Sequence, residues 1–82
     1  MPTSTIATKL PTQFQARING KVQHRVGDGM LHDIPHGQEV HVDTALASMV
    51  LSWTSGGQPV TVTLARDEFL FYVEEGRIEV LP

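Results

Sequence analysis

Histidine is the residue type in this chain best suited to chemistry at neutral pH. His32, His36 and His41 fall within ten residues, and His24 precedes them. Imidazole nitrogens bind zinc, copper or nickel, so a cluster of them is a candidate metal site. The His-x3-His-x4-His spacing aligns three rings only on a helix, and the glycines and proline within 29–37 exclude a helix there. Metal binding by the three histidines is therefore an alternative hypothesis, and we expect no cofactor.

Enzyme motifs do not appear in the sequence. The chain has no cysteine, which excludes disulfides, thiolate zinc sites and cysteine nucleophiles. It has no nucleophile elbow, phosphate-binding loop, dinucleotide-binding glycine motif or HExxH motif. His32 and Asp33 are adjacent on a predicted loop with no nucleophile beside them, and 82 residues leave little room for a deep pocket. We expect that the protein is not an enzyme.

A row of basic and amide side chains is the first surface feature. Arg17, Lys21, Gln23 and Arg25, with Gln15, share the outer face of a hairpin predicted for 13–26. Such a ribbon can contact phosphates, so nucleic-acid binding is an alternative function. The net charge of −3 and the absence of an aromatic residue in the row weigh against it.

The segment 66–75 is the second surface feature. As a helix it turns Phe69 inward and places Phe71 on the opposite side among Asp67, Glu74 and Glu75. An exposed aromatic ring with a carboxylate rim is typical of a protein contact site. As a strand the segment has apolar residues on both faces, which again requires cover by a partner. Phe71 therefore indicates binding to another protein or self-association.

The N-terminal elements that position these residues are a tail, a hairpin and a loop. Residues 1–12 are rich in Thr, Ser and Pro and predict a flexible tail. In 13–26 apolar and polar residues alternate around Asn19-Gly20, which predicts a hairpin with Gly20 in the left-handed conformation of a G1 bulge. Residues 27–37 predict a loop.

The remaining elements are mostly strands. Alternation predicts strands over 38–43, 60–64 and 77–81. Residues 45–54 fit a strand or a helix, and the turn signal at 54–58 favours a strand that forms a hairpin with 60–64. Residues 66–75 favour a helix over a strand because acids occupy the first turn and Gly76 follows.

Together these elements predict a small α+β domain over 13–82. We expect a mostly antiparallel sheet or half-open barrel of about five strands with one short helix near the C-terminus. No apolar run reaches the length of a membrane span, and the N-terminus lacks the apolar stretch of a secretory signal, so we expect a cytoplasmic protein. The expected function is a non-catalytic binding or regulatory module that acts through a protein partner or as a homodimer.

Overall fold

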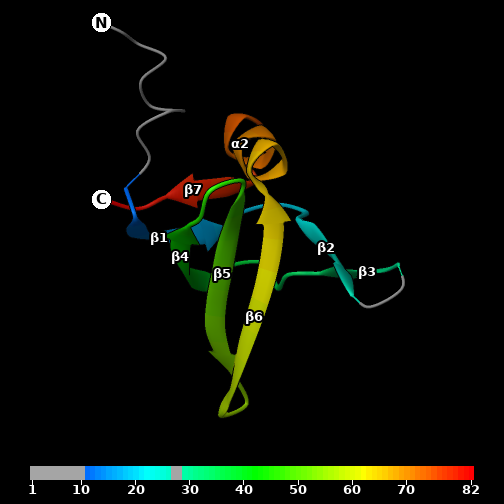
Figure 1. The fold of residues 1–82 in the computed structure, drawn as a ribbon. Helices are drawn as coiled ribbons and strands as arrows, with labels where there is room; N and C mark the ends of the chain where they lie inside the picture. The colour runs from blue at the N-terminus through cyan, green and yellow to red at the C-terminus, as the bar shows by residue number, and fades with distance from the viewer. Residues whose placement is uncertain (1–10, 27–28) are drawn as a thin grey trace, which may run out of the picture.

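The computed structural model describes residues 11–26 and 29–82, which form a five-stranded antiparallel sheet, a separate two-stranded sheet and a helix (Figure 1). The larger sheet has the order β6-β5-β4-β1-β7. Its strands in chain order are β1 (Gln13–Ile18), β4 (Glu39–Thr44), β5 (Ser48–Ser55), β6 (Gln58–Ala65) and β7 (Ile78–Val80). The smaller sheet pairs β2 (Gln23–Val26) with β3 (Met30–Asp33), and the helix is α2 (Arg66–Glu74). This is the small α+β fold that the sequence predicts.

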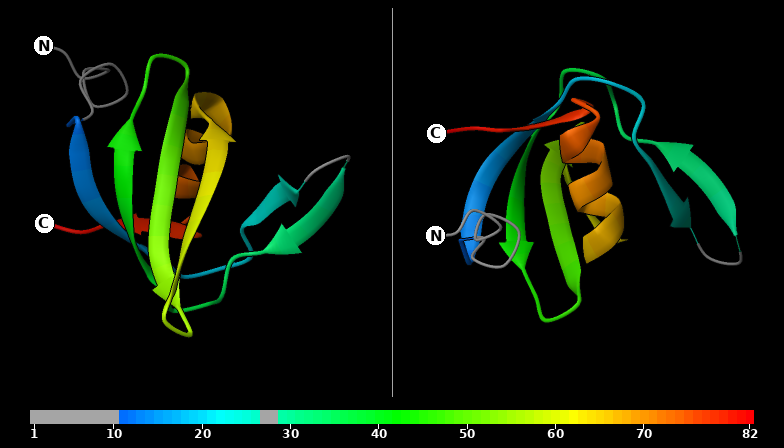
Figure 2. Two further views of the ribbon diagram at one scale, coloured as in Figure 1. Left: turned by 60° about the horizontal axis from the view of Figure 1, so that its bottom comes forward. Right: turned by 90° about the horizontal axis from the view of Figure 1, so that it is seen from above.

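Alternation along the strands separates a buried face of the sheet from a polar one. In β1, Ala16 and Ile18 are buried, whereas Gln15 is exposed and Arg17 is half-buried. The helix α2 lies against the apolar face and contributes the buried Phe69 (Figure 2). The other buried hydrophobic residues are Val22, Ile34, Val40, Val42, Met49, Leu51, Val62, Leu64 and Ile78. One core between α2 and the sheet therefore holds the domain together.

Local signals account for both ends of α2. The Glu68 carboxylate accepts a hydrogen bond from the Ala65 amide at 3.2 Å, which satisfies one donor at the start of the helix. At the other end Gly76 adopts a φ of 76°, its amide bonds to the Val73 carbonyl, and the Arg77 amide bonds to the Tyr72 carbonyl. This is the Schellman arrangement of a glycine-terminated helix, and it turns the chain back so that Arg77 lies beside the last helical turn.

The hairpin predicted for residues 13–26 is wrong. The two partners of β1 are β4 and β7, and β2 pairs with β3. Gly20 does not adopt a positive φ, and its backbone instead lies close to Arg77, where a side chain would not fit without a shift. The amides of Asn19 and Gly20 both donate to the Arg77 carbonyl, at 2.8 and 3.1 Å, so this turn is attached to the C-terminal segment.

The loop predicted for 27–37 is also wrong in part, because β3 occupies Met30–Asp33. We call β2 and β3 together the arm. It projects from the β6 side of the molecule, as Figure 1 and the left-hand view of Figure 2 show. At its base Ile34 and Val22 are buried and share a backbone hydrogen bond, so the arm is attached to the core at its root.

The other predicted elements are confirmed. Strands β4, β5, β6 and β7 and the helix α2 all form close to their predicted positions. Gly56 and Gly57 make the two-residue turn between β5 and β6, with φ of 57° and 81°. Residues 1–10 of the predicted tail lie outside the described residues, whereas the carbonyls of Pro11 and Thr12 accept hydrogen bonds from Thr44.

Candidate functional site

The exposed side of α2 carries the candidate protein-binding residues. Phe71 is 50% exposed, whereas Phe69, two positions earlier, is fully buried. Asp67, Glu74 and Glu75 are exposed on the same helix or directly after it. We call Asp67, Phe71, Glu74 and Glu75 the α2 outer face. A helical step of about 100° per residue places Phe71 between Asp67 and Glu75, as the helical interpretation of the sequence predicts.

Arg77 supports the ring of Phe71, a contact that the sequence analysis missed. Its guanidinium carbon lies 5.8 Å from the centre of the Phe71 ring and 5.9 Å from that of Tyr72. The same guanidinium is 3.9 Å from the Glu75 carboxylate. The available signal was a basic residue directly after a helix-terminating glycine, since such a residue returns to the last turn. Arg77 therefore lies against one side of the aromatic anchor.

The predicted basic row does not form one surface. Arg17 lies on β1 between β4 and the edge strand β7, where it bridges Glu39 of β4 at 3.0 Å and Glu79 of β7 at 3.5 Å. Gln23 and Arg25 belong to the arm, and Lys21 lies just before it. The Gln23 amide donates to the Tyr72 hydroxyl at 3.4 Å, and Arg25 donates to the Gly29 carbonyl at 3.0 Å. Nucleic-acid binding stays a prediction, and the residues offered for it are divided between β1, the segment before the arm and the arm itself.

The histidines are also distributed over the fold. His41 lies on the polar face of the sheet, with Nδ1 3.2 Å from the side-chain amide nitrogen of Gln15 and Nε2 3.5 Å from the Asp43 carboxylate. The structure does not bring His32, His36 and His41 together as a metal site: within 11–26 and 29–82 no three His, Cys, Asp or Glu residues gather in a way that could hold a metal. Metal binding stays an untested alternative.

A histidine pair lies across the arm. His24 of β2 and His32 of β3 are register partners with ring centres 6.1 Å apart. Burial, and secondly the charge that His32 can carry, lower the pKa of His24 below its ordinary value of 6.5. The pair therefore favours the uncharged state of His24 in the folded protein.

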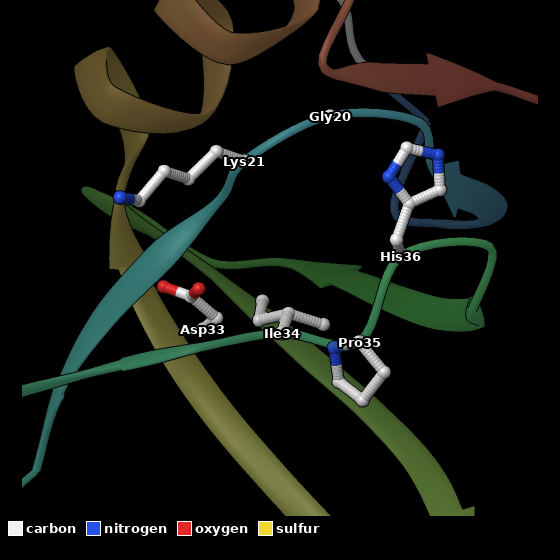
Figure 3. A pocket seen from close by; sticks show the side chains of 6 residues that line it. All are labelled: Gly20, Lys21, Asp33, Ile34, Pro35 and His36. Carbon is white, nitrogen blue, oxygen red and sulfur yellow. The ribbon is translucent and has the colours of Figure 1, made fainter.

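Two shallow pockets lie near these features. The larger, about 440 Å³, is formed where the root of the arm meets the loop before β4 (Figure 3). It is lined by Gly20, Lys21, Asp33, Ile34, Pro35 and His36. The amine of Lys21 and the ring of His36 lie at opposite sides of it in Figure 3, so they do not converge on one ligand atom. The smaller pocket, about 260 Å³, lies beside Leu46 and the start of α2.

Comparisons with protein families, with curated proteins and with solved structures found no match. Across residues 11–26 and 29–82, no helix has the length and apolar character needed to cross a membrane.

Proposed function

We propose that this protein is a non-catalytic binding module and that its α2 outer face binds another protein. The observation that carries the proposal is the half-exposed Phe71 ring, held against Arg77 on a helix whose neighbouring exposed side chains are carboxylates. The absence of cysteine supports a reducing compartment, so the cytoplasm is the location that we propose for the module.

The contact would combine one apolar anchor with charge complementarity. About half of the Phe71 side chain is still open to water, and burying that half is worth about 1 kcal/mol. The acidic residues Asp67, Glu74 and Glu75 favour a partner segment with Lys or Arg around a bulky apolar residue. Exposed charges steer the encounter more than they hold the complex, and salt weakens their effect.

A display experiment with random peptides tests this proposal. The immobilised protein selects from a phage-displayed library, and the selected peptides are then synthesised and titrated. We expect enrichment of basic peptides that carry a bulky apolar residue. Binding should weaken about 10-fold or more in Phe71→Ala, because interface anchors are typically worth more than about 1–2 kcal/mol.

The matched control is Leu31→Ala, because Leu31 is an apolar side chain at the tip of the arm that is 52% exposed, close to the exposure of Phe71. This variant should bind the peptides as the unmodified protein does. Selected peptides that bind Phe71→Ala with unchanged affinity, or that carry no basic residues, would contradict the proposal.

A further inference from the structure

The arm exposes large apolar side chains in a strand that has little to stabilise it. All four residues of β3 are exposed, and at the tip Met30 is 70% and Leu31 52% exposed. A two-stranded hairpin without further cover is only marginally stable in water. The arm therefore has the properties of a segment that a partner covers.

Both faces of the arm require cover. Val26 pairs with Met30 and Arg25 with Leu31, so the two exposed apolar residues at the tip are neighbours in the strand and point to opposite faces. A partner that lies flat on one face leaves the other in water. The partner must therefore pack around the arm or along its edge.

The charge of the arm disfavours a polyanionic partner. Its strands carry Arg25 and Asp33, which offset each other, and the sequence between them adds Asp28, so no positive charge is left uncompensated. Arg25 is also bonded to the Gly29 carbonyl next to the tip. A polyanion gains little from such a surface, because phosphate binding depends on uncompensated Lys and Arg.

The outer edge of β3 offers backbone groups for pairing. The hydrogen bond from the Ile34 amide to the Val22 carbonyl fixes which residues of the arm bond to each other. By alternation, the amides and carbonyls of Leu31 and Asp33 point away from β2. On the β2 side, the outward amide of Gln23 already donates to Tyr72, so the β3 edge is the more open of the two.

The edge strand β6 lies on the same side of the molecule as the arm (Figure 2). It is eight residues long and has no charged side chain, and β5 beside it has none either. The two-residue turn makes Ser55 and Gln58 a bonded pair, so the backbone groups of Thr61 and Thr63 point outward. Natural edge strands are normally protected by charges, by proline or by short length, and β6 has such protection only at Pro59 beside the turn, which leaves the edge from Thr61 to Thr63 open. The opposite edge, β7, is both short and charged, with three residues and Glu79.

We propose that a second copy of this chain binds the arm and the adjacent β6 edge, so that the protein is a homodimer. Two copies of one strand edge can pair with each other across a two-fold axis. A second copy therefore supplies the hydrogen-bonding neighbour that the outer edges of β3 and β6 lack in the described sheets. A stable dimer buries roughly 800 Å² on each copy, which is about 15% of the 5321 Å² surface of the chain. One half-exposed phenylalanine is too small for that area, and the projecting ribbon together with the eight-residue edge is a larger surface.

Sedimentation equilibrium measures the mass directly. We expect the unmodified chain to have twice its monomer mass of 9.0 kDa and the double variant Met30→Lys, Leu31→Lys to be a monomer. Both residues are exposed, so the double variant should keep its cooperative unfolding. Leu46→Lys is the matched control, since it adds positive charge at an exposed leucine away from the arm, and it should stay dimeric.

A second pair of variants tests the β6 edge. Thr61→Pro removes an amide that points away from β5, a position of the kind that Pro59 occupies two residues earlier, so it spares the β5–β6 hydrogen bonds. We expect Thr61→Pro to weaken dimerisation at least 10-fold and Thr61→Val to leave it unchanged.

A monomer at all concentrations, or a dimer that survives the double lysine substitution, overturns the proposal. The proposal also fails if the protein is a monomer that binds fluorescein-labelled duplex DNA and loses that binding in Arg25→Glu. The arm would then bind nucleic acid and not a second copy of the chain. Phe71→Ala should remain a dimer, which separates this proposal from the function proposed for the α2 outer face.

Discussion

Two phenylalanines on the same helix should respond very differently to truncation. Phe69 is fully buried and contacts Phe14 edge to face, with ring centres 5.9 Å apart. Phe71 is half exposed and contacts Arg77 and Tyr72 at the surface. We expect Phe69→Ala to destabilise the fold severely and Phe71→Ala to leave it largely intact.

The magnitudes follow from burial. Truncating a fully buried phenylalanine costs about 3–5 kcal/mol, a large share of the roughly 4–12 kcal/mol expected for a chain of this length. For Phe71, the buried half of the ring contributes about 1 kcal/mol and the contact with Arg77 about 0.5–1 kcal/mol. The higher helix propensity of alanine offsets about 0.5 kcal/mol of this loss. The net cost of Phe71→Ala is therefore about 1 kcal/mol.

Urea unfolding followed by the fluorescence of Trp53 measures the loss in the free energy of unfolding for both variants, because this single tryptophan packs against the core from β5. Phe71→Ala should lower the thermal midpoint by about 4–8 °C and Phe69→Ala by at least about 12 °C. Equal losses of stability in the two variants would refute the reasoning, since they would show that Phe71 belongs to the core and cannot serve as an exposed anchor.

Two further predictions concern the turn at Gly20 and the histidine pair. A Cβ added at Gly20 would lie 3.0 Å from Cγ and 3.2 Å from Cα of Arg77, so Gly20→Ala should cost about 1–3 kcal/mol in urea unfolding; unchanged stability would show that the two segments separate freely. In an NMR titration the pKa of His24 should lie below 6.5 and rise only in part in His32→Gln, because burial is the larger cause. A lowered pKa means that the unfolded chain binds the proton more readily than the folded protein does. The contribution of His24 to stability is therefore present above pH 6.5 and is lost as the pH falls through the pKa of His24 in the folded protein. A His24 pKa at or above 6.5 would contradict this.

Periodicity predicted which side of each strand is buried more reliably than it predicted strand partners. The inward positions of β1, Ala16 and Ile18, are those that alternation indicates, although β1 pairs with distant strands and not with its neighbour. Alternation depends on one strand alone, whereas pairing depends on which remote strands bury the same face. The Asn19-Gly20 signal was therefore overridden by backbone bonds to Arg77, which no local pattern encodes.

The candidate site was predictable to a similar degree. Helical spacing was enough to place Phe71 outward between carboxylates. The contact from Arg77 depends on the turn at Gly76, and the division of the basic row depends on sheet order, so neither follows from spacing. The strand β3 was missed because it buries none of its side chains, and burial is what makes a strand visible in a sequence.

The strand order also sets when the sheet can be completed during synthesis. Among the described strands of this sheet β1 is made first and β7 last, yet they are neighbours, and Arg17 of β1 binds Glu79 of β7. Until β7 emerges from the ribosome, β1 has an open edge and Arg17 lacks one of its two carboxylates. Because closing such a long stretch of chain is slow, we expect the sheet to be completed only after β7 has been made, with the nascent β1 edge open to mispairing until that strand arrives.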